Sequence, residues 1–503
     1  MREEDSNTGR GVTPTERYLA KLCRRSFLSL WSYPAVYRDQ GRCHGKGDGK
    51  EVCDLLVVFE NHIIIFSDKD CRFSGTNNLE AAWGRWYKNA ILKSALQVWG
   101  AERWIKQFPN NLFLDRQCTT PFPISLPDAA NAIFHRIVVA HDSGRYYRKI
   151  LSGSGSLMLD STLVGDAHLQ RPFTIGQINP EKGYVHVFDD TTLDIVMSTL
   201  DTITDFTRYL VKKEQFLTSN KKVLATGEEE LLAVYLMRGN ENGEHDFVIE
   251  GEYDTLCLLE GGWDGFTQNP QRKEQLKRDR ISYAWDMLIE KFAFHTITKT
   301  EHFTTGGPLS EQEIMFRFMA REPRTRRRML AISLGEVLER SIKSDQPWDA
   351  RITPAAGAAE PYYVFLFVKH PPDASDADYR NMRMELLHAY CVVTKLKYPQ
   401  AKHIVGIASD GEDTTQRSED LFYLDASDWS AEAQSTAIEI QQRLGILKEV
   451  KLKMHREYDY PIDHTGKLRD PALSRNSLCP CGSRQRFKRC CGKEIFDKRH
   501  RGT

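Results

Sequence analysis

The sequence predicts a multidomain α/β protein that ends in a small metal-binding module. Its 503 residues are enough for roughly three domains of about 150 residues each. Short runs of β-branched and aromatic residues alternate with longer segments of helical periodicity, as expected for sheets packed against helices. The composition is 41% apolar and 27% charged, which is typical of globular proteins and excludes a wholly disordered or collagen-like chain.

The first predicted element is a helix over residues 14–31. Thr13, Pro14 and Glu16 form a capping box with proline at the first helical position. The residues of the apolar face recur with helical spacing and are Leu19, Leu22, Cys23, Ser26, Phe27 and Leu30. Glu16 lies at the inner edge of this face, so it is either the N3 residue of the cap or a carboxylate that points into a site.

A β-hairpin is predicted over residues 51–69, with an apolar run on each side of the polar turn Glu60-Asn61. Both faces of the two strands are apolar, so the hairpin is expected at the centre of a sheet. If Phe59 and His62, which flank the turn, form a pair, strand alternation then sets the direction of every side chain in the hairpin.

Charged residues stand at the ends of these buried strands, where an unpaired charge is costly. In this register Asp54 lies opposite Ser67, Lys69 shares their face, and Asp68 points to the other face. Carboxylates in such a place can hold Mg²⁺ or Mn²⁺, which activates water and clamps a scissile phosphate. Lys69 would orient that water or offset the developing charge.

A long amphipathic helix is predicted over residues 79–105. Two polar residues, Ser94 and Gln97, interrupt its apolar stripe. Gln97 either bonds to the backbone or reaches into a site on the neighbouring sheet. Four tryptophans of this segment are expected in the core rather than at a base-stacking surface, namely Trp83, Trp86, Trp99 and Trp104.

These elements resemble the PD-(D/E)xK nuclease superfamily, in which a helix carrying a Glu precedes an Asp-bearing strand and a strand that ends in Asp/Glu-x-Lys. The resemblance covers residues 13–110 and implies a restriction-endonuclease-like core over residues 1–125. It also implies a nuclease site with Mg²⁺ or Mn²⁺ as cofactor. The residues implied for this site are Asp54 and Asp68 as metal ligands, Glu16 as an auxiliary carboxylate, Lys69 as the catalytic lysine and Gln97 as a positioning group.

Ser67 departs from the superfamily pattern because it stands where a carboxylate is expected. A bulge could swing Asp68 into the site, Glu51 or Glu16 could supply the second carboxylate, or the fold could be kept without catalysis. A second carboxylate that converges with Asp54 would favour a nuclease. An Asp68 side chain that points away would favour a non-catalytic adaptor.

The α/β pattern continues over residues 126–345. Strands are predicted at 133–140, 173–178, 184–188 and 247–249, and helices at 191–217, 228–237, 270–294 and 310–341. A basic stretch interrupted by Pro323 is expected on the solvated surface or in contact with phosphate. Its members are Arg317, Arg321, Arg324, Arg326, Arg327 and Arg328.

Residues 346–448 predict a second α/β domain. Its strands are expected at 362–369, 403–408 and 421–424, and its helices at 377–396 and 430–444. The charged residues 449–474 are expected to form a linker to the last module.

That module is predicted from four cysteines within thirteen residues, Cys479, Cys481, Cys490 and Cys491. Four thiolates suit tetrahedral zinc. Residues 475–503 bury too little apolar surface to fold alone, so zinc binding would supply their folding free energy. The predicted role of this zinc is therefore structural.

The cysteine segment resembles the SEC-C motif, the zinc-binding tail of the preprotein translocase ATPase SecA. The match extends beyond the cysteines to Asn476, Pro480, Gly482, Ser483, Phe487, Lys488 and Gly492. The resemblance implies a zinc knuckle that docks to other macromolecules, proteins or ribosomes among them. Residues 475–503 also carry nine Lys or Arg against two acids, a local excess of seven positive charges that could hold nucleic-acid phosphates.

The whole chain has 69 basic and 69 acidic side chains, so no global charge draws it to nucleic acid or to a membrane. Its most apolar run, residues 55–66, is interrupted by Glu60, Asn61 and His62 and is shorter than the roughly 20 residues that span a bilayer. No apolar signal segment is seen in the first thirty residues, and a cytoplasmic location is expected. The leading functional expectation is a metal-dependent nuclease acting on DNA or RNA. The alternative is an adaptor that binds nucleic acid, ribosome or protein.

Overall fold

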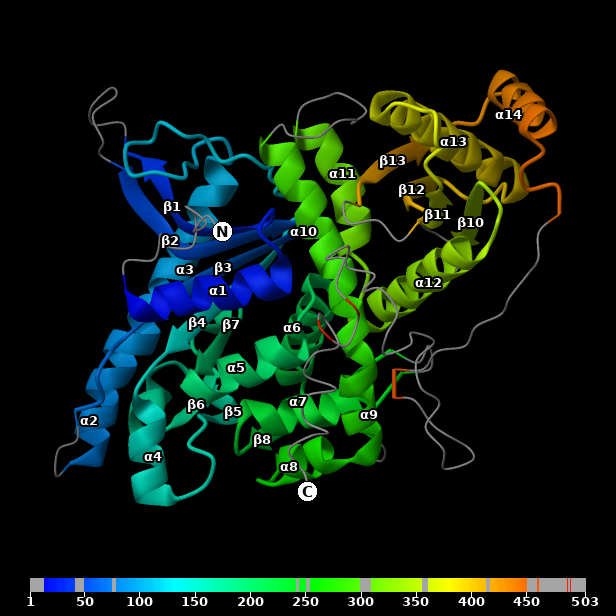
Figure 1. The fold of residues 1–503 in the computed structure, drawn as a ribbon. Coiled ribbons are helices and arrows are strands. Elements are labelled where there is room, and N and C mark those ends of the chain that lie inside the picture. The colour runs from blue at the N-terminus through cyan, green and yellow to red at the C-terminus, as the bar shows by residue number, and fades with distance from the viewer. Residues whose placement is uncertain are drawn as a thin grey trace. The chain divides into compact units, whose positions relative to one another are not determined.

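The computed structural model describes residues 13–40, 49–74, 78–240, 244–249, 254–298, 309–354, 361–412, 417–449, 459–460, 486 and 489. The chain has a mixed α/β structure and divides into two compact units, Met1–Asn269 and Pro270–Thr503 (Figure 1). No helix among the described residues has the length and apolar character needed to cross a membrane.

The first unit is built on a five-stranded sheet of order β1-β2-β3-β4-β7. Its strands are β1 (Ser32–Asp39), β2 (Gly49–Phe59), β3 (His62–Lys69), β4 (Ile133–Ala140) and β7 (Val185–Asp189). The first three strands form an antiparallel meander, and β4 and β7 run parallel to β3. Phe59 pairs with His62, which confirms the predicted register of the hairpin. The last two strands lie beyond residue 125, so the sheet continues past the expected nuclease-like segment.

Helices cover both faces of this sheet. The helix α3 (Lys93–Gln107) packs on β2, β3 and β4, and α1 (Pro14–Phe27) packs on β2, β3 and α5 (Asp190–Thr199). Figure 1 shows α1 crossing in front of the strands. Consecutive side chains of a strand point to opposite faces, and Ser67 bonds to α3 while Asp68 reaches the α5 side through His141. The two helical layers therefore lie on opposite sides of β3.

The first helix is shorter than predicted. It ends at Phe27, because Leu28 takes a backbone φ of 66° and turns the chain out of the helix. The following residues form β1, a strand at the sheet edge that was not predicted. Pro34 lies in this strand, where an edge tolerates its missing N–H group.

The predicted helix over residues 79–105 is continuous in space but has three parts. The α-helices α2 (Leu79–Trp86) and α3 flank a π-helical turn, η1 (Tyr87–Leu92), which was not predicted and is a feature often found at functional sites. Trp83 and Trp86 are buried as expected. Trp99 and Trp104 are only half-buried, so the prediction of a core position is wrong for these two.

The rest of the first unit contains a second sheet of order β6-β5-β8-β9. Its strands are β5 (Met158–Val164), β6 (Thr174–Gln177), β8 (Lys222–Ala225) and β9 (Thr255–Leu258). Its further helices are α4 (Ser143–Leu151), η2 (Gly165–Gln170), η3 (Pro180–Lys182), α6 (Ile203–Leu217), α7 (Glu228–Met237) and α8 (Gly262–Gln268).

Two predictions for this region are wrong. The helix predicted over 191–217 is two helices, because Thr202 starts α6 by accepting a hydrogen bond from the Asp205 N–H. Residues 247–249 are not a strand. Phe247 instead packs on the rings of Phe216 and Tyr235, so its apolar character serves the core and not a sheet.

The second unit is built on a four-stranded sheet of order β10-β11-β12-β13. Its strands are β10 (Trp348–Thr353), β11 (Tyr362–Val368), β12 (His403–Asp410) and β13 (Glu419–Asp425). Its helices are α9 (Pro270–Asp279), η4 (Arg280–Ser282), α10 (Tyr283–Thr298), α11 (Leu309–Ala320), α12 (Arg324–Lys343), α13 (Asp376–Lys397) and α14 (Ala431–Leu444). The predicted α/β order over 362–444 is confirmed, whereas β10 was not predicted.

The helix α13 connects the parallel strands β11 and β12 and packs closely on β12. Gly406 permits this contact, because a Cβ atom there would lie 2.6 Å from Sγ of Cys391 and 2.9 Å from Cδ1 of Leu387. The helix α12 packs on β10 and β11.

Four of the six arginines around Pro323 are buried, which corrects the prediction of a solvated or phosphate-binding surface for these four, namely Arg324, Arg326, Arg327 and Arg328. Arg327 and Arg328 are fully buried, and Arg324 is 8% exposed. Asp286 accepts hydrogen bonds from Arg327 at 2.6 Å and from Arg324 at 2.8 Å. Burial brings the arginines to carboxylates of α9 and α10, so these charges are neutralised inside the unit and are not offered to phosphate.

Three histidines lie on neighbouring strands of the first sheet. Nδ1 of His62 is 2.9 Å from Nε2 of His135, and the ring centroids of His135 and His186 are 6.4 Å apart. His135 is 1% exposed and His186 is fully buried. Burial lowers the pKa of His135 to about 3 and that of His186 well below its usual value.

These histidines predict that the first unit loses stability in mild acid. The unfolded chain takes up protons near pH 6.5, whereas His135 and His186 stay neutral in the folded chain. Their contribution to the free energy of unfolding is therefore complete above pH 6.5. Below that pH it falls by up to about 1.4 kcal/mol per pH unit for each histidine. Urea unfolding at neutral and mildly acidic pH measures the dependence. An equally steep dependence in the double variant His135→Leu/His186→Leu would contradict the assignment.

Candidate active site

Asp54 of β2 is the centre of a hydrogen-bonded group at the sheet. Its Oδ2 atom accepts a hydrogen bond from the Asp68 N–H at 2.6 Å, and its Oδ1 atom accepts one from Nε2 of Gln97 at 3.4 Å. Ser67 donates from Oγ to Oε1 of Gln97 at 3.1 Å. Asp54, Ser67 and Gln97 therefore lie together on the face covered by α3. The hairpin register predicted the position of Asp54 opposite Ser67, and of the two alternatives for Gln97 the structure shows the one that reaches the sheet.

A bulge in β2 brings a second carboxylate to this group. Val36 of β1 pairs with Cys53, but Tyr37 pairs with Glu51, so Val52 is an extra residue in β2. Residues three positions apart on a regular strand point to opposite faces, and one extra residue reverses that relation. Glu51 thus faces the same side of the sheet as Asp54 although it is three positions away.

The electrostatics of the site reflect this crowding of carboxylates. Burial, followed by the charges of Asp54 and Glu16, raises the pKa of Glu51 to about 7. Burial also raises the pKa of Asp54, against the opposing effects of its hydrogen bond from Asp68 and the charge of Lys69. The Lys69 charge lowers the pKa of both carboxyl groups, and alternation along β3 places this lysine on the same face as Ser67.

Glu16 fulfils the capping role and also adds its charge to the site. Oε2 of Glu16 accepts a hydrogen bond from the Thr13 N–H at 3.2 Å, and Oγ1 of Thr13 accepts one from the Glu16 N–H at 3.2 Å. The predicted capping box is therefore confirmed. The Glu16 charge still raises the pKa of Glu51 and Asp54, so the start of α1 lies close to the site.

The Asp68 side chain makes its contacts on the other face of the sheet, although its charge also raises the pKa of Asp54. Its Oδ1 atom lies 2.6 Å from Nε2 of His141, and the other nitrogen of that ring contacts Asp190 of α5. Burial alone would lower the pKa of His141, but its contacts with Asp190 and Asp68 raise it to about 10. The histidine is thus a charged bridge between two carboxylates on the α5 side of the sheet.

His141 and Asp190 were not predicted as site residues. His141 is 73 residues from its partner Asp68, and Asp190 is 49 residues from its partner His141. No short motif links them. The available signal was their position, since each directly follows a strand that runs parallel to β3. The carboxyl ends of neighbouring parallel strands bring such residues together.

No cluster of three or more His, Cys, Asp or Glu side chains suited to a metal ion occurs within the part of the chain that the structure describes. Glu51 and Asp54 are thus a pair of carboxylates and not a complete ligand cage. The four cysteines of the predicted zinc knuckle, Cys479, Cys481, Cys490 and Cys491, lie outside the described residues.

Comparison with known protein families gives a match for one segment of the chain. Residues 475–493 match the family model of the SEC-C motif. This match confirms the resemblance that the cysteine spacing suggested. No curated protein and no solved structure matches the chain, so the nuclease resemblance of the first unit has no support from relatives and stays a prediction.

Proposed function

We propose that the first unit is a metal-dependent hydrolase of phosphodiester bonds in DNA or RNA. The observation that carries this proposal is the bulge in β2, which puts Glu51 on the same face as Asp54. The charge of Lys69 at the end of β3 lowers the pKa of both carboxyl groups. The strand order and the position of α3 beside the hairpin also support the proposal, because such a core would need a sheet of this kind with a helix on the face that carries Asp54.

The residues at this site fit Mg²⁺ or Mn²⁺. Burial raises the pKa of half-buried Glu51 and of buried Asp54, and the charge of a bound divalent cation would favour the ionised form of both. Mg²⁺ is usually bound by one or two protein carboxylates together with water and phosphate oxygens, so a full protein cage is not required. Asp54 and Glu51 would hold the ion, with Glu16 as an auxiliary carboxylate. The ion would supply an activated water and a clamp for the phosphate.

The other side chains would position groups and balance charge. The Lys69 ammonium group would offset negative charge that develops on the phosphate. Gln97, held by Ser67, donates to Asp54 and so fixes the orientation of that carboxyl group. The superfamily pattern expects a carboxylate at the position of Ser67. In this arrangement Glu51 of the neighbouring strand β2 would supply that carboxylate.

A cleavage assay tests the proposal directly. Purified protein is incubated with plasmid, single-stranded DNA and RNA in Mg²⁺ or Mn²⁺, and a parallel set contains EDTA. Cleavage that EDTA abolishes is the expected result. Failure to cleave any substrate, with nucleic-acid binding retained, would favour the non-catalytic adaptor, which the side-chain position of Asp68 also favours.

We also propose that the SEC-C segment binds one structural zinc ion through Cys479, Cys481, Cys490 and Cys491 and docks the protein to a macromolecular partner. The basic residues of this segment favour nucleic acid or the ribosome among such partners. The protein would act in the cytoplasm.

Zinc content is expected to depend on the cysteine pairs of this segment. The wild-type chain should carry one zinc per molecule by mass spectrometry of metals, and the double variant Cys490→Ser/Cys491→Ser should carry almost none, because two of four ligands are lost. Cys257→Ser is the matched control, since Cys257 is an exposed free cysteine of the first unit. Equal zinc in all three proteins would contradict the ligand assignment.

A further inference from the structure

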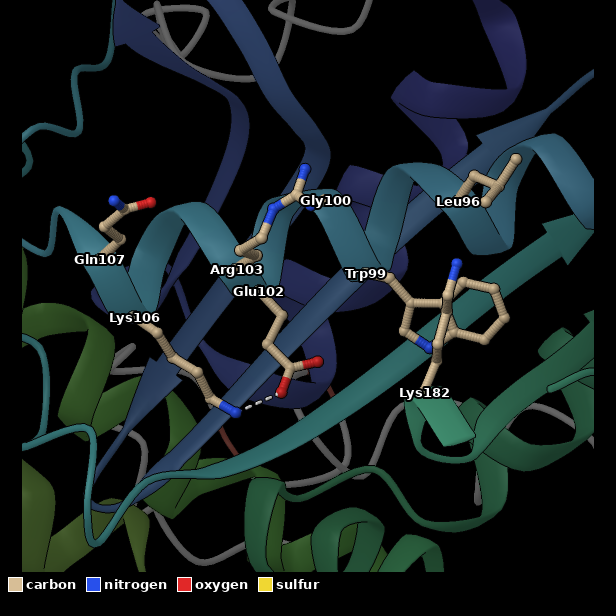
Figure 2. Close-up of a pocket in the computed structure, with 8 residues that line it drawn as sticks. All are labelled: Leu96, Trp99, Gly100, Glu102, Arg103, Lys106, Gln107 and Lys182. Atoms are coloured by element: carbon tan, nitrogen blue, oxygen red, sulfur yellow. Dashed lines mark hydrogen bonds and ion pairs between the residues drawn. The ribbon is translucent and has the colours of Figure 1, made fainter. Parts of the chain in front are cut away.

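The outer side of α3 carries a groove that the candidate active site does not use. Its volume is about 590 Å³, within the range of roughly 300–1,000 Å³ that ligand pockets occupy. Figure 2 shows the groove lined by side chains of α3 and by Lys182 of η3. We call this feature the α3 groove.

The α3 groove is positively charged. Three of its lining residues are cations: Arg103, Lys106 and Lys182. Among the described residues that line it, Glu102 is the one carboxylate, and it already accepts hydrogen bonds from Arg136 at 2.7 Å and from Lys106 at 2.6 Å. The surface therefore offers net positive charge to an anionic ligand.

The groove also offers an aromatic ring. Trp99 donates from its indole N–H to the Gly183 carbonyl at 3.3 Å, which fixes the orientation of the ring. Nζ of Lys182 lies 5.3 Å from the ring centroid, and this lysine is exposed. Trp99 is half-buried, and a solvent-accessible cation is held on such a ring more weakly than a stacked base. A base could therefore replace the Lys182 ammonium group on the ring, and the ammonium group would then turn to a phosphate.

An apolar side chain extends the same surface. Leu96 is 51% exposed at the end of the groove nearest to Gln97. From Leu96 to Lys106 the helix rises about 15 Å, so the groove runs along α3 away from the turn that carries Gln97. An aromatic platform with cations along a channel is the arrangement that binds single strands of nucleic acid.

We propose that the α3 groove binds a single-stranded segment of nucleic acid. A base stacks on Trp99, and the phosphates on either side contact Arg103, Lys106 and Lys182. A duplex does not fit this role, because its bases are stacked on each other and present no free face to the indole ring. This inference rests on the proposed nuclease function in one respect: it takes the bound strand to be the substrate of the site that contains Gln97, which lies beside the groove.

The first test measures affinity by fluorescence anisotropy. Fluorescein-labelled oligothymidine and oligouridine are titrated with the full chain in EDTA, so that binding is measured without cleavage. Arg103→Glu and Lys182→Glu should each weaken binding by about tenfold, because each replaces a phosphate contact by a repulsive charge. The matched control is Lys149→Glu, which makes the same charge change at an exposed residue of α4 and should leave affinity within about twofold.

The second test locates the bound base. Oligonucleotides that contain 5-iodouracil are crosslinked to the full chain by ultraviolet light, and tryptic peptides are identified by mass spectrometry. Trp99 is the only aromatic residue of the tryptic peptide 94–103, so a crosslink on this peptide identifies the stacked base. Lys182→Glu should reduce the yield, and Trp99→Phe should retain it.

Crosslinks confined to other peptides, together with unchanged affinity of Arg103→Glu and Lys182→Glu, would overturn the proposal. Tighter binding of a duplex of the same length would assign the groove to duplex backbone instead. The thymidine and uridine arms show whether DNA or RNA is preferred. These measurements need no metal, so they test the groove even if the chain fails to cleave nucleic acid. Cleavage without binding at the groove would reject this inference and leave the proposed nuclease function standing.

Discussion

Replacement of Lys69 by Ala, or of Asp54 by Asn, is expected to lower the cleavage rate by about 10²–10³-fold or more. Lys69→Ala removes the positive charge that faces Asp54 and Glu51. Asp54→Asn keeps the shape of a side chain that accepts a hydrogen bond from the Asp68 N–H but removes the charge that a divalent cation needs. Single-turnover cleavage in Mn²⁺ measures the rates, and circular dichroism shows whether each variant is folded.

A matched pair of variants distinguishes the two possible partners of Asp54. Glu51→Gln should lower the rate to a similar extent, because the bulge in β2 places Glu51 beside Asp54. Asp68→Asn should keep the rate within about threefold, because its side chain contacts His141 on the other side of the sheet. The opposite result, with activity lost in folded Asp68→Asn and kept in Glu51→Gln, would restore Asp68 as the metal ligand that the sequence suggested.

The substitution Asp286→Ala is expected to destabilise the second unit by about 3–5 kcal/mol. Asp286 accepts hydrogen bonds from Arg324 and Arg327, and although burial opposes the effect, these two charges hold its pKa below the usual value. Without the carboxylate, Arg327 would keep a charge inside the unit with no counter-ion at this contact. Urea unfolding followed by tryptophan fluorescence measures the change, since Trp285 is buried beside this residue.

Asp345→Ala is the control for charge removal in the same unit. Asp345 is exposed, so its loss should change the free energy of unfolding by no more than about 0.5 kcal/mol. If Asp286→Ala were destabilised no more than this control, the arginines around Pro323 would be solvated in solution, as the sequence had suggested.

Local sequence patterns predicted the direction of some side chains at the candidate site but not of others. Alternation of side chains along the hairpin was enough to place Asp54 with Ser67 and to separate Asp68 from them. The same pattern could not place Glu51, because its direction depends on a pairing irregularity between β1 and β2, and β1 itself was not predicted. Sequence alone could therefore leave Glu51 only as one of several alternatives.

The sequence by itself determined the capping box at Thr13, the register of the hairpin, the α/β order of the second unit and the SEC-C segment. These features depend on neighbours a few residues apart, whose periodicity and backbone preferences act locally. Only the tertiary structure decided the bulge at Val52, the bridge through His141 and the burial of the arginines on α12. Each of these joins segments far apart in the chain, and their partners are set by how sheets and helices pack together, which no local pattern specifies.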